Sequence, residues 1–178
     1  MIPRTSLGID LSTSATGLVL LRSDGQGLPT LLLEQEVKGK GTGMSRVNDM
    51  VRAIMTLIHH HKPDTIVLEG YSLNTKNASS IIPLVEVGGA LRLMMWLDGL
   101  AWYDPRASEV KKFATGKGNA PKEKVMMHVL KRFSHESQTN NTADAYVCAA
   151  MGLAIWNLLN PVTMEMRSLA CGLTKRLS

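Results

Sequence analysis

Three carboxylates lie at the edges of apolar segments, where an acidic side chain needs a partner. Asp10 follows an apolar run in "GIDLSTSATG" (8–17), Glu69 directly follows "TIVL", and Asp144 lies in "TNNTADAYVCAA" (139–150). Burial of an unpaired carboxylate is costly, so a cation is expected against Asp10. Taken singly, Glu69 could be a surface residue at a strand end, and Asp144 an aspartate that the helix dipole favours. Taken together, the three form the hard oxygen set that binds Mg²⁺ or Mn²⁺.

The positive charge of the chain is confined to one window. Residues 105–135 carry eight Lys and Arg against Glu109 and Glu123, a net charge of +6, so the other residues carry −1. A charge run is usually a solvated helix face. Here the lysines are interleaved with glycines, and a flexible basic loop suits phosphate groups. The basic window therefore favours nucleic acid as the partner. Two metal ions about 3.5–4 Å apart, held by the carboxylates, can hold the attacking water and the leaving oxygen of a phosphodiester, so the two features together favour a nuclease.

The order of the predicted elements indicates an α/β domain with a mixed five-stranded sheet flanked by helices. Apolar runs bounded by turn residues predict strands at Thr5–Leu11, Gly17–Arg22, Leu31–Val37, Thr65–Leu68 and Ala101–Tyr103. Apolar periodicity and end signals predict helices at 44–61, 78–97, 105–116, 119–133 and 142–159. A crossover through the first helix makes the strands before Asp10 and Glu69 parallel and adjacent. Both carboxylates then lie at the sheet edge where such folds place their sites.

The chain is predicted to form one domain over residues 1–160, with a peripheral C-terminal tail at 161–178. Cys148 and Cys171 lack the spacing of metal ligands, and the longest uncharged apolar run, 146–159, is too short to span a bilayer. We therefore expect reduced cysteines, a cytoplasmic location and no membrane segment. His59–His61 cannot converge on one metal ion, because consecutive helical residues point about 100° apart.

The sequence resembles the RuvC family of Holliday junction resolvases, which have an RNase H-like fold. "GIDLSTSATG" is similar to the first strand and turn of that family, and "IVLEGYSLNTKNASS" to its second motif. The basic segment "EVKKFATGKGNAPKEKV" and the helix "TADAYVCAA" follow in the family's order, so the resemblance covers residues 5–157. "GKGNAPKEKV" is the most specific of these motifs, whereas the first motif is also similar to the phosphate loops of actin-like kinases. The resemblance implies a dimeric, Mg²⁺-dependent endonuclease that cuts four-way DNA junctions.

The same resemblance implies a role for each matching residue. Asp10, Glu69 and Asp144 match the metal-binding carboxylates, which would hold two ions, and Lys122 matches a lysine close to the scissile phosphate. An ammonium there stabilises the charge that develops during hydrolysis. The DNA contacts expected beyond these are Lys111, Lys112, Lys117, Lys124, Lys76 and Asn77, with Tyr71 as the aromatic that stacks at the branch point.

One position departs from the family pattern. The family commonly has a fourth metal ligand, acidic or histidine, three residues before the last aspartate, and here that residue is Asn141. The spacing places Asn141 and Asp144 on one helix face. An amide oxygen can bind a metal but contributes no charge, so we expect activity that needs more Mg²⁺ or prefers Mn²⁺.

The long helix 78–97 is expected to contribute to a homodimer, because the family dimerises through this region. Its apolar residues Met94–Leu97 are too broad a stretch for one buried face. A four-way junction presents two symmetry-related strands, which a twofold dimer matches. The sequence identifies no motor protein that would move the branch point.

Three other functions remain open at the level of sequence. A nuclease of the same fold could act on flaps, replication forks or RNA, since a single sequence does not reveal the surfaces that read substrate shape. A non-catalytic module that binds branched DNA would explain Asn141, but not the intact carboxylates and Lys122. A small actin-like ATPase would need a second phosphate loop and a second lobe, for which 178 residues are too few.

Overall fold

The structure, a computed structural model, describes residues 2–71 and 78–176. The strands are β1 (Arg4–Asp10), β2 (Thr16–Ser23), β3 (Thr30–Val37) and β4 (Thr65–Leu68). The helices are α1 (Gly43–His61), α2 (Ala78–Leu97), α3 (Ala107–Thr115), α4 (Lys122–Phe133), α5 (Asn140–Ile155) and α6 (Met164–Arg176).

The sheet is mixed, with the strand order β3-β2-β1-β4. β1 pairs antiparallel with β2 and parallel with β4, and β2 pairs antiparallel with β3. Ile9 lies opposite Leu68 in the parallel pair, so β1 and β4 end at the same edge of the sheet. The predicted mixed α/β architecture, including the adjacent parallel strands, is therefore confirmed.

The prediction of a fifth strand at Ala101–Tyr103 is wrong. The described sheet has four strands, and this segment contributes a single parallel bridge between Tyr103 and Val67. Tyr103 donates its N–H to the Ile66 carbonyl and accepts from the Leu68 N–H, both at 2.9 Å. The Pro105 carbonyl still accepts from the Gly70 N–H at 2.7 Å, but Pro105 has no N–H to donate in return and the chain turns into α3 at Ala107, so no second bridge forms.

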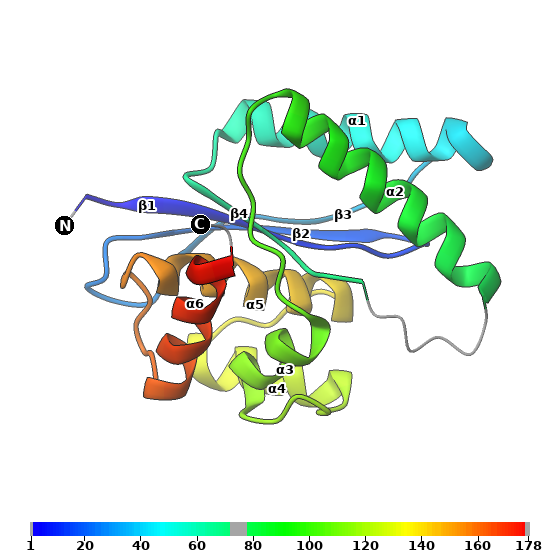
Figure 1. The fold of residues 1–178 in the computed structure, drawn as a ribbon. Helices are drawn as coiled ribbons and strands as arrows, with labels where there is room; N and C mark the ends of the chain where they lie inside the picture. The colour runs from blue at the N-terminus through cyan, green and yellow to red at the C-terminus, as the bar shows by residue number, and fades with distance from the viewer. Residues whose placement is uncertain (1, 72–77, 177–178) are drawn as a thin grey trace.

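Helices cover both faces of the sheet (Figure 1). α1 and α2 lie on one face, and α5 lies on the other with α3, α4 and α6 outside it. The strands alternate between two buried clusters, as period-two side chains require. Leu18 and Leu20 of β2 pack with α1 and α2, whereas Val19 and Leu21 pack with the helices of the opposite face.

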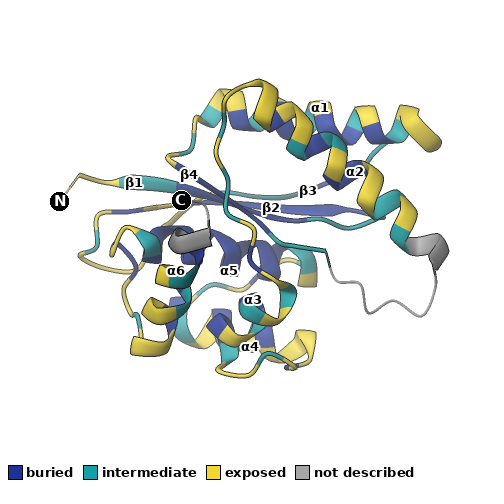
Figure 2. Cartoon of the chain, viewed as in Figure 1, coloured by how far each residue is buried: buried dark blue, intermediate teal, exposed yellow. Residues whose placement is uncertain are grey.

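α5 is the central helix of its layer, and it is buried along most of its length (Figure 2). Small residues let it approach the sheet closely. A Cβ atom on Gly17 of β2 would overlap the main-chain oxygen of Asn141, and one on Gly152 would overlap the Ser6 hydroxyl of β1. α5 begins two residues earlier than predicted, so Asp144 lies in its second turn rather than its first.

The segment after Pro161, predicted to be a peripheral tail, contains α6. Met166, Ala170 and Leu173 of α6 are buried in the same cluster as α5. The helix thus covers α5 and adds to the core, while the boundary at residue 160 stays a prediction.

Candidate active site

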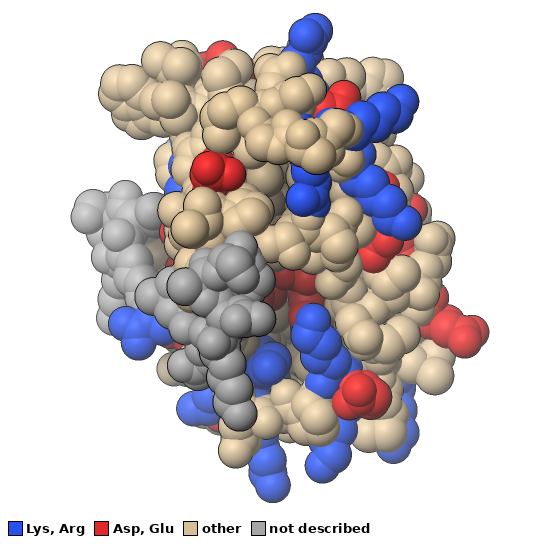
Figure 3. Space-filling model, turned by 90° about the vertical axis from the view of Figure 1, so that its right-hand side faces the viewer, with Lys and Arg blue, Asp and Glu red and all other residues tan. Residues whose placement is uncertain are grey.

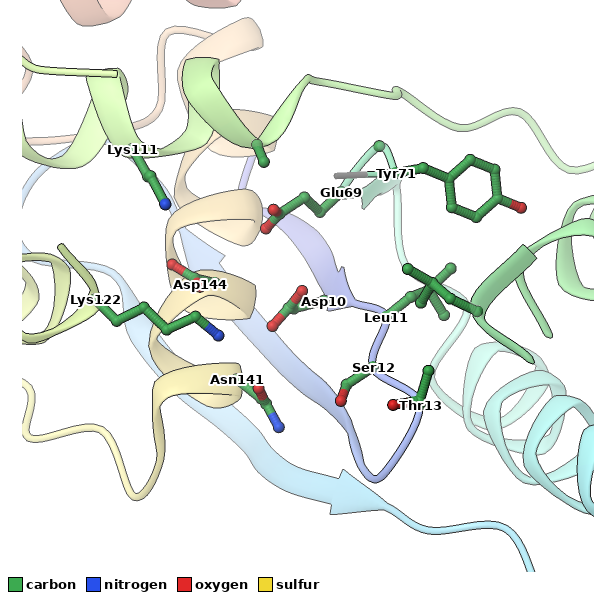
Figure 4. A pocket seen from close by; sticks show the side chains of 13 residues that line it. Asp10, Leu11, Ser12, Thr13, Glu69, Tyr71, Lys111, Lys122, Asn141 and Asp144 are labelled. Carbon is green, nitrogen blue, oxygen red and sulfur yellow. The ribbon is translucent and has the colours of Figure 1, made fainter. Parts of the chain in front are cut away.

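The three predicted carboxylates converge at one edge of the sheet (Figure 4). Asp10 is the last residue of β1, Glu69 directly follows β4, and Asp144 lies on α5. One carboxylate oxygen from each lies within 4.8 Å of the others. The parallel pairing of β1 and β4 continues to the site, where the Glu69 N–H donates to the Ile9 carbonyl at 2.9 Å.

Burial and mutual repulsion disfavour the ionised forms of these groups. Burial, followed by the charge of Asp144, raises the pKa of Glu69 from 4.5 to about 8. The pKa of Asp10 is raised by burial and then by the charges of Glu69 and Asp144, and burial also raises the pKa of Asp144. Lys122 opposes all three shifts.

The chemistry of this cluster fits a divalent cation. Glu69 Oε2 and Asp144 Oδ1 are buried and have no hydrogen-bond partner within the described part of the chain. Buried oxygens of this kind normally have a partner. A hard cation satisfies them, removes the repulsion between the carboxylates and favours their ionised forms.

A cavity of about 310 Å³ opens over the carboxylates and is also lined by Lys111 of α3, Lys122 of α4 and Asn141. In Figure 4 both lysine side chains point toward the carboxylates. Figure 3 shows the same arrangement at the surface, with a red hollow bordered by blue side chains on the side of α3 and α4. A phosphate in this cavity would meet the carboxylates and the lysines together.

The other predicted DNA contacts lie in different environments. Lys117 and Lys124 are exposed, and Lys112 is paired with Glu165 of α6, Nζ to Oε1, at 3.3 Å. Lys76 and Asn77 lie outside the described residues.

Tyr71 lines the cavity but is held against α2. The Arg92 guanidinium lies 4.5 Å from its ring centroid, and the Tyr71 hydroxyl donates to the Val85 carbonyl at 3.3 Å. Arg92 therefore covers one face of the ring, and stacking at a branch point, which would use the other face, stays a prediction.

Asn141 lines the cavity one helical turn before Asp144, on the shared face that the spacing predicts. Its side-chain amide donates to the Ala15 carbonyl at 2.9 Å and to Glu36 Oε1 at 3.1 Å. Glu36 is not among the site residues predicted from the sequence. The available signal is the alternation in "EQEV" (34–37), which directs Glu34 and Glu36 to one face of β3.

Residues 6–154 match the family described as "Crossover junction endodeoxyribonuclease RuvC". This chain belongs to the RuvC family. A RuvC of Chlorobium phaeobacteroides is 30% identical over 154 residues, which cover 86% of this chain and 80% of that protein. A RuvC of Pseudomonas paraeruginosa is 30% identical over 124 residues, covering 70% of this chain and 71% of that protein.

Solved structures of the family share the fold. A structure of Thermus thermophilus RuvC matches with a TM-score of 0.72 and 22% identity, over 86% of this chain and 97% of that one. T. thermophilus RuvC in complex with a Holliday junction substrate matches with a TM-score of 0.71 and 21% identity, over 82% of this chain and 90% of that one. The fold predicted from the motifs is thereby confirmed. None of the described helices combines the length and apolarity that crossing a membrane requires.

Proposed function

We propose that this RuvC-family endonuclease resolves Holliday junctions by divalent-metal-dependent hydrolysis of two symmetry-related phosphodiesters. The observation that carries the proposal is the carboxylate cluster of Asp10, Glu69 and Asp144, which shares one cavity with Lys111 and Lys122. Membership of the family supports the reaction class, and the T. thermophilus complex supports the four-way junction as the substrate.

Asp10, Glu69 and Asp144 would hold Mg²⁺, for which oxygen ligands and substrate phosphate are the usual partners. When bound, two such ions supply a metal-activated water and stabilise the leaving oxygen. Lys122 places its ammonium beside the scissile phosphate and stabilises the charge there. Lys111, Lys112, Lys117 and Lys124 contact the DNA backbone, which positions the substrate without reading its sequence.

A homodimer would place two such sites on one junction. The outer side of α2 is apolar, with Leu93, Trp96 and Leu97 exposed at 55, 68 and 61%. Leu93 and Met94 also line an apolar groove between α1 and α2. By contrast, Met95 is fully buried in the core. Exposed apolar area of this kind marks an interface, and a second copy would cover it with twofold symmetry.

We assign the nuclease to residues 1–160, which contain every side chain placed in the site above. Residues 161–178 support it through α6. Acting on DNA, with both cysteines free, the protein is assigned to the cytoplasm.

The test is cleavage of an immobile four-way DNA junction beside a matched linear duplex, a flap, a fork and an RNA duplex, with Mg²⁺ or Mn²⁺. We expect paired symmetric nicks on the junction alone, abolished by Asp10→Asn. Glu136→Gln, which neutralises an exposed carboxylate beyond the cavity, should leave cleavage unchanged. Equal cutting of flaps or forks would mean a general structure-selective nuclease. Tight junction binding without cleavage under either metal would mean a binding module.

A further inference from the structure

Glu36 of β3 joins the sheet to the start of α5, immediately behind the site. Its Oε1 accepts hydrogen bonds from the Thr139 hydroxyl at 2.8 Å and from the Asn141 amide at 3.1 Å. Glu36 is half-buried and pairs with Gly17 across the β2–β3 ladder. It is not one of the three clustered carboxylates, so it faces the site through Asn141.

The orientation of the Asn141 amide follows from its two neighbours. Glu36 Oε1 and the Ala15 carbonyl are both acceptors, and both lie on the side of the Asn141 nitrogen. The opposite orientation would place the amide oxygen against two acceptors and lose both hydrogen bonds. The oxygen is thus held on the other side. Figure 4 shows it on the side nearer to Asp10, with the nitrogen turned away.

We propose that Glu36 is a positioning residue for the metal site: it fixes the Asn141 amide so that the amide oxygen serves as a neutral ligand. This inference rests on the proposed metal-dependent function. Ligands in metal sites are commonly oriented by a hydrogen-bonded carboxylate behind them. Asn141 carries no charge, and Glu36, which is hydrogen-bonded to its amide on the side away from the cavity, supplies a negative charge instead.

A purely structural role would act through Thr139 instead. The Thr139 hydroxyl caps α5 by accepting from the Thr142 N–H at 3.1 Å and donates to Glu36. Glu36 could then serve only to anchor the helix. The two roles predict different results, since helix anchoring changes stability and ligand orientation changes metal affinity.

The experiment measures Mn²⁺ binding to the full chain without DNA, by isothermal titration calorimetry at one fixed pH. Thermal unfolding in EDTA reports folding separately. We expect Glu36→Ala, which removes the acceptor of the Asn141 amide, and Asn141→Ala each to weaken Mn²⁺ binding by about 10- to 100-fold. The double variant should bind no more weakly than either single one, because both changes remove the same oriented ligand. Thr139→Val should lower the unfolding temperature and leave Mn²⁺ affinity unchanged.

The second part of the experiment moves the carboxylate from position 36 to position 141 and measures Mn²⁺ affinity again. Asn141→Asp alone would place two carboxylates at hydrogen-bond distance, so we expect no gain in Mn²⁺ affinity. Adding Glu36→Gln to Asn141→Asp removes the repulsion and should increase the affinity at least tenfold over Asn141→Asp alone. Equal affinities with and without Glu36→Gln, or additive losses in the first part, would overturn the inference.

Asp10→Asn separates this inference from the proposed function. If Asp10→Asn abolishes Mn²⁺ binding while Glu36→Ala has no effect, the metal site stands and the role of Glu36 is overturned. If the protein binds no Mn²⁺, or Asp10→Asn binds it as tightly as the wild type, the metal-dependent function fails and the inference fails with it.

Discussion

Gly8 of β1 and Ala145 of α5 are in direct main-chain contact, so closely that a Cβ atom on Gly8 would overlap the carbonyl oxygen of Ala145. This contact lies two residues from Asp10 along the strand and one residue from Asp144 along the helix. The distance between the two carboxylates is therefore set by an approach that any larger residue at position 8 would prevent.

Gly8→Ala should accordingly force α5 away from the sheet. We expect a loss of about 1–3 kcal/mol in the free energy of unfolding, as for other overpacked sites, measured by urea denaturation. Mn²⁺ affinity should fall as well, because Asp144 moves away from Asp10. Gly27→Ala is the matched control, since nothing lies within 4 Å of its added Cβ. Equal stability of the two variants would show that α5 adjusts without cost.

α6 offers a second test of packing. Leu173 is 2% exposed in the cluster beneath α5, whereas Met164 at the start of the same helix is 88% exposed. Leu173→Ala should cost about 2–5 kcal/mol of unfolding free energy, and Met164→Ala less than about 0.5 kcal/mol. Chemical denaturation followed by circular dichroism measures both. A loss below 0.5 kcal/mol for Leu173→Ala would mean that the tail is dispensable for folding.

The convergence of Asp10 and Glu69 could be predicted from sequence because it depends on local rules. A strand, a helix and a second strand make a parallel pair, and residues at equivalent strand ends meet. Asp144 could be predicted as the third carboxylate of the site because its helix carries a recognisable motif. The three carboxylates could thus be predicted from the order of the elements and the spacing of the motifs, without knowledge of how the elements pack.

Glu36 could not be placed in the same way. Its contact with Asn141 spans 105 residues and depends on the β2–β3 register and on how closely α5 packs on the sheet. The sequence also did not show that Lys112 is paired with Glu165, because that contact needs α6 in place. The sequence predicts a strand at Ala101–Tyr103, where the structure has a single bridge at Tyr103, because three apolar residues satisfy a strand pattern whether or not they pair.

Without metal, the protein should lose stability as the pH rises. The folded-state pKa of Glu69 is raised from 4.5 to about 8. Between these values the folded protein binds more protons than the unfolded chain, so the free energy of unfolding falls with increasing pH. This contribution is complete below pH 4.5 and is lost as the pH rises through about 8.

Thermal unfolding in EDTA across this pH range measures the effect. We expect the unfolding temperature to fall by at least about 2–4 °C, the shift that 1 kcal/mol produces in a domain of this size. Glu69→Gln should flatten the dependence, and Mg²⁺ should stabilise the wild type most at high pH, where the carboxylates are ionised. Identical pH dependences for wild type and Glu69→Gln would contradict the assignment of this loss to the cluster.

A comparison of Lys122 with Lys112 distinguishes a lysine that accelerates cleavage from one that only strengthens DNA binding. Both lie in the basic window, but Lys122 lines the cavity beside the carboxylates, whereas Lys112 is paired with Glu165. Lys122→Ala should lower the single-turnover cleavage rate on a saturating junction by about 10²–10³-fold, as loss of an electrostatic stabiliser of the transition state does. Lys112→Ala should leave that rate unchanged and weaken junction binding, most at low salt, because the variant makes one phosphate contact fewer and its affinity depends less steeply on salt. Similar rates for the two variants at saturation would mean that Lys122 contributes only to DNA affinity.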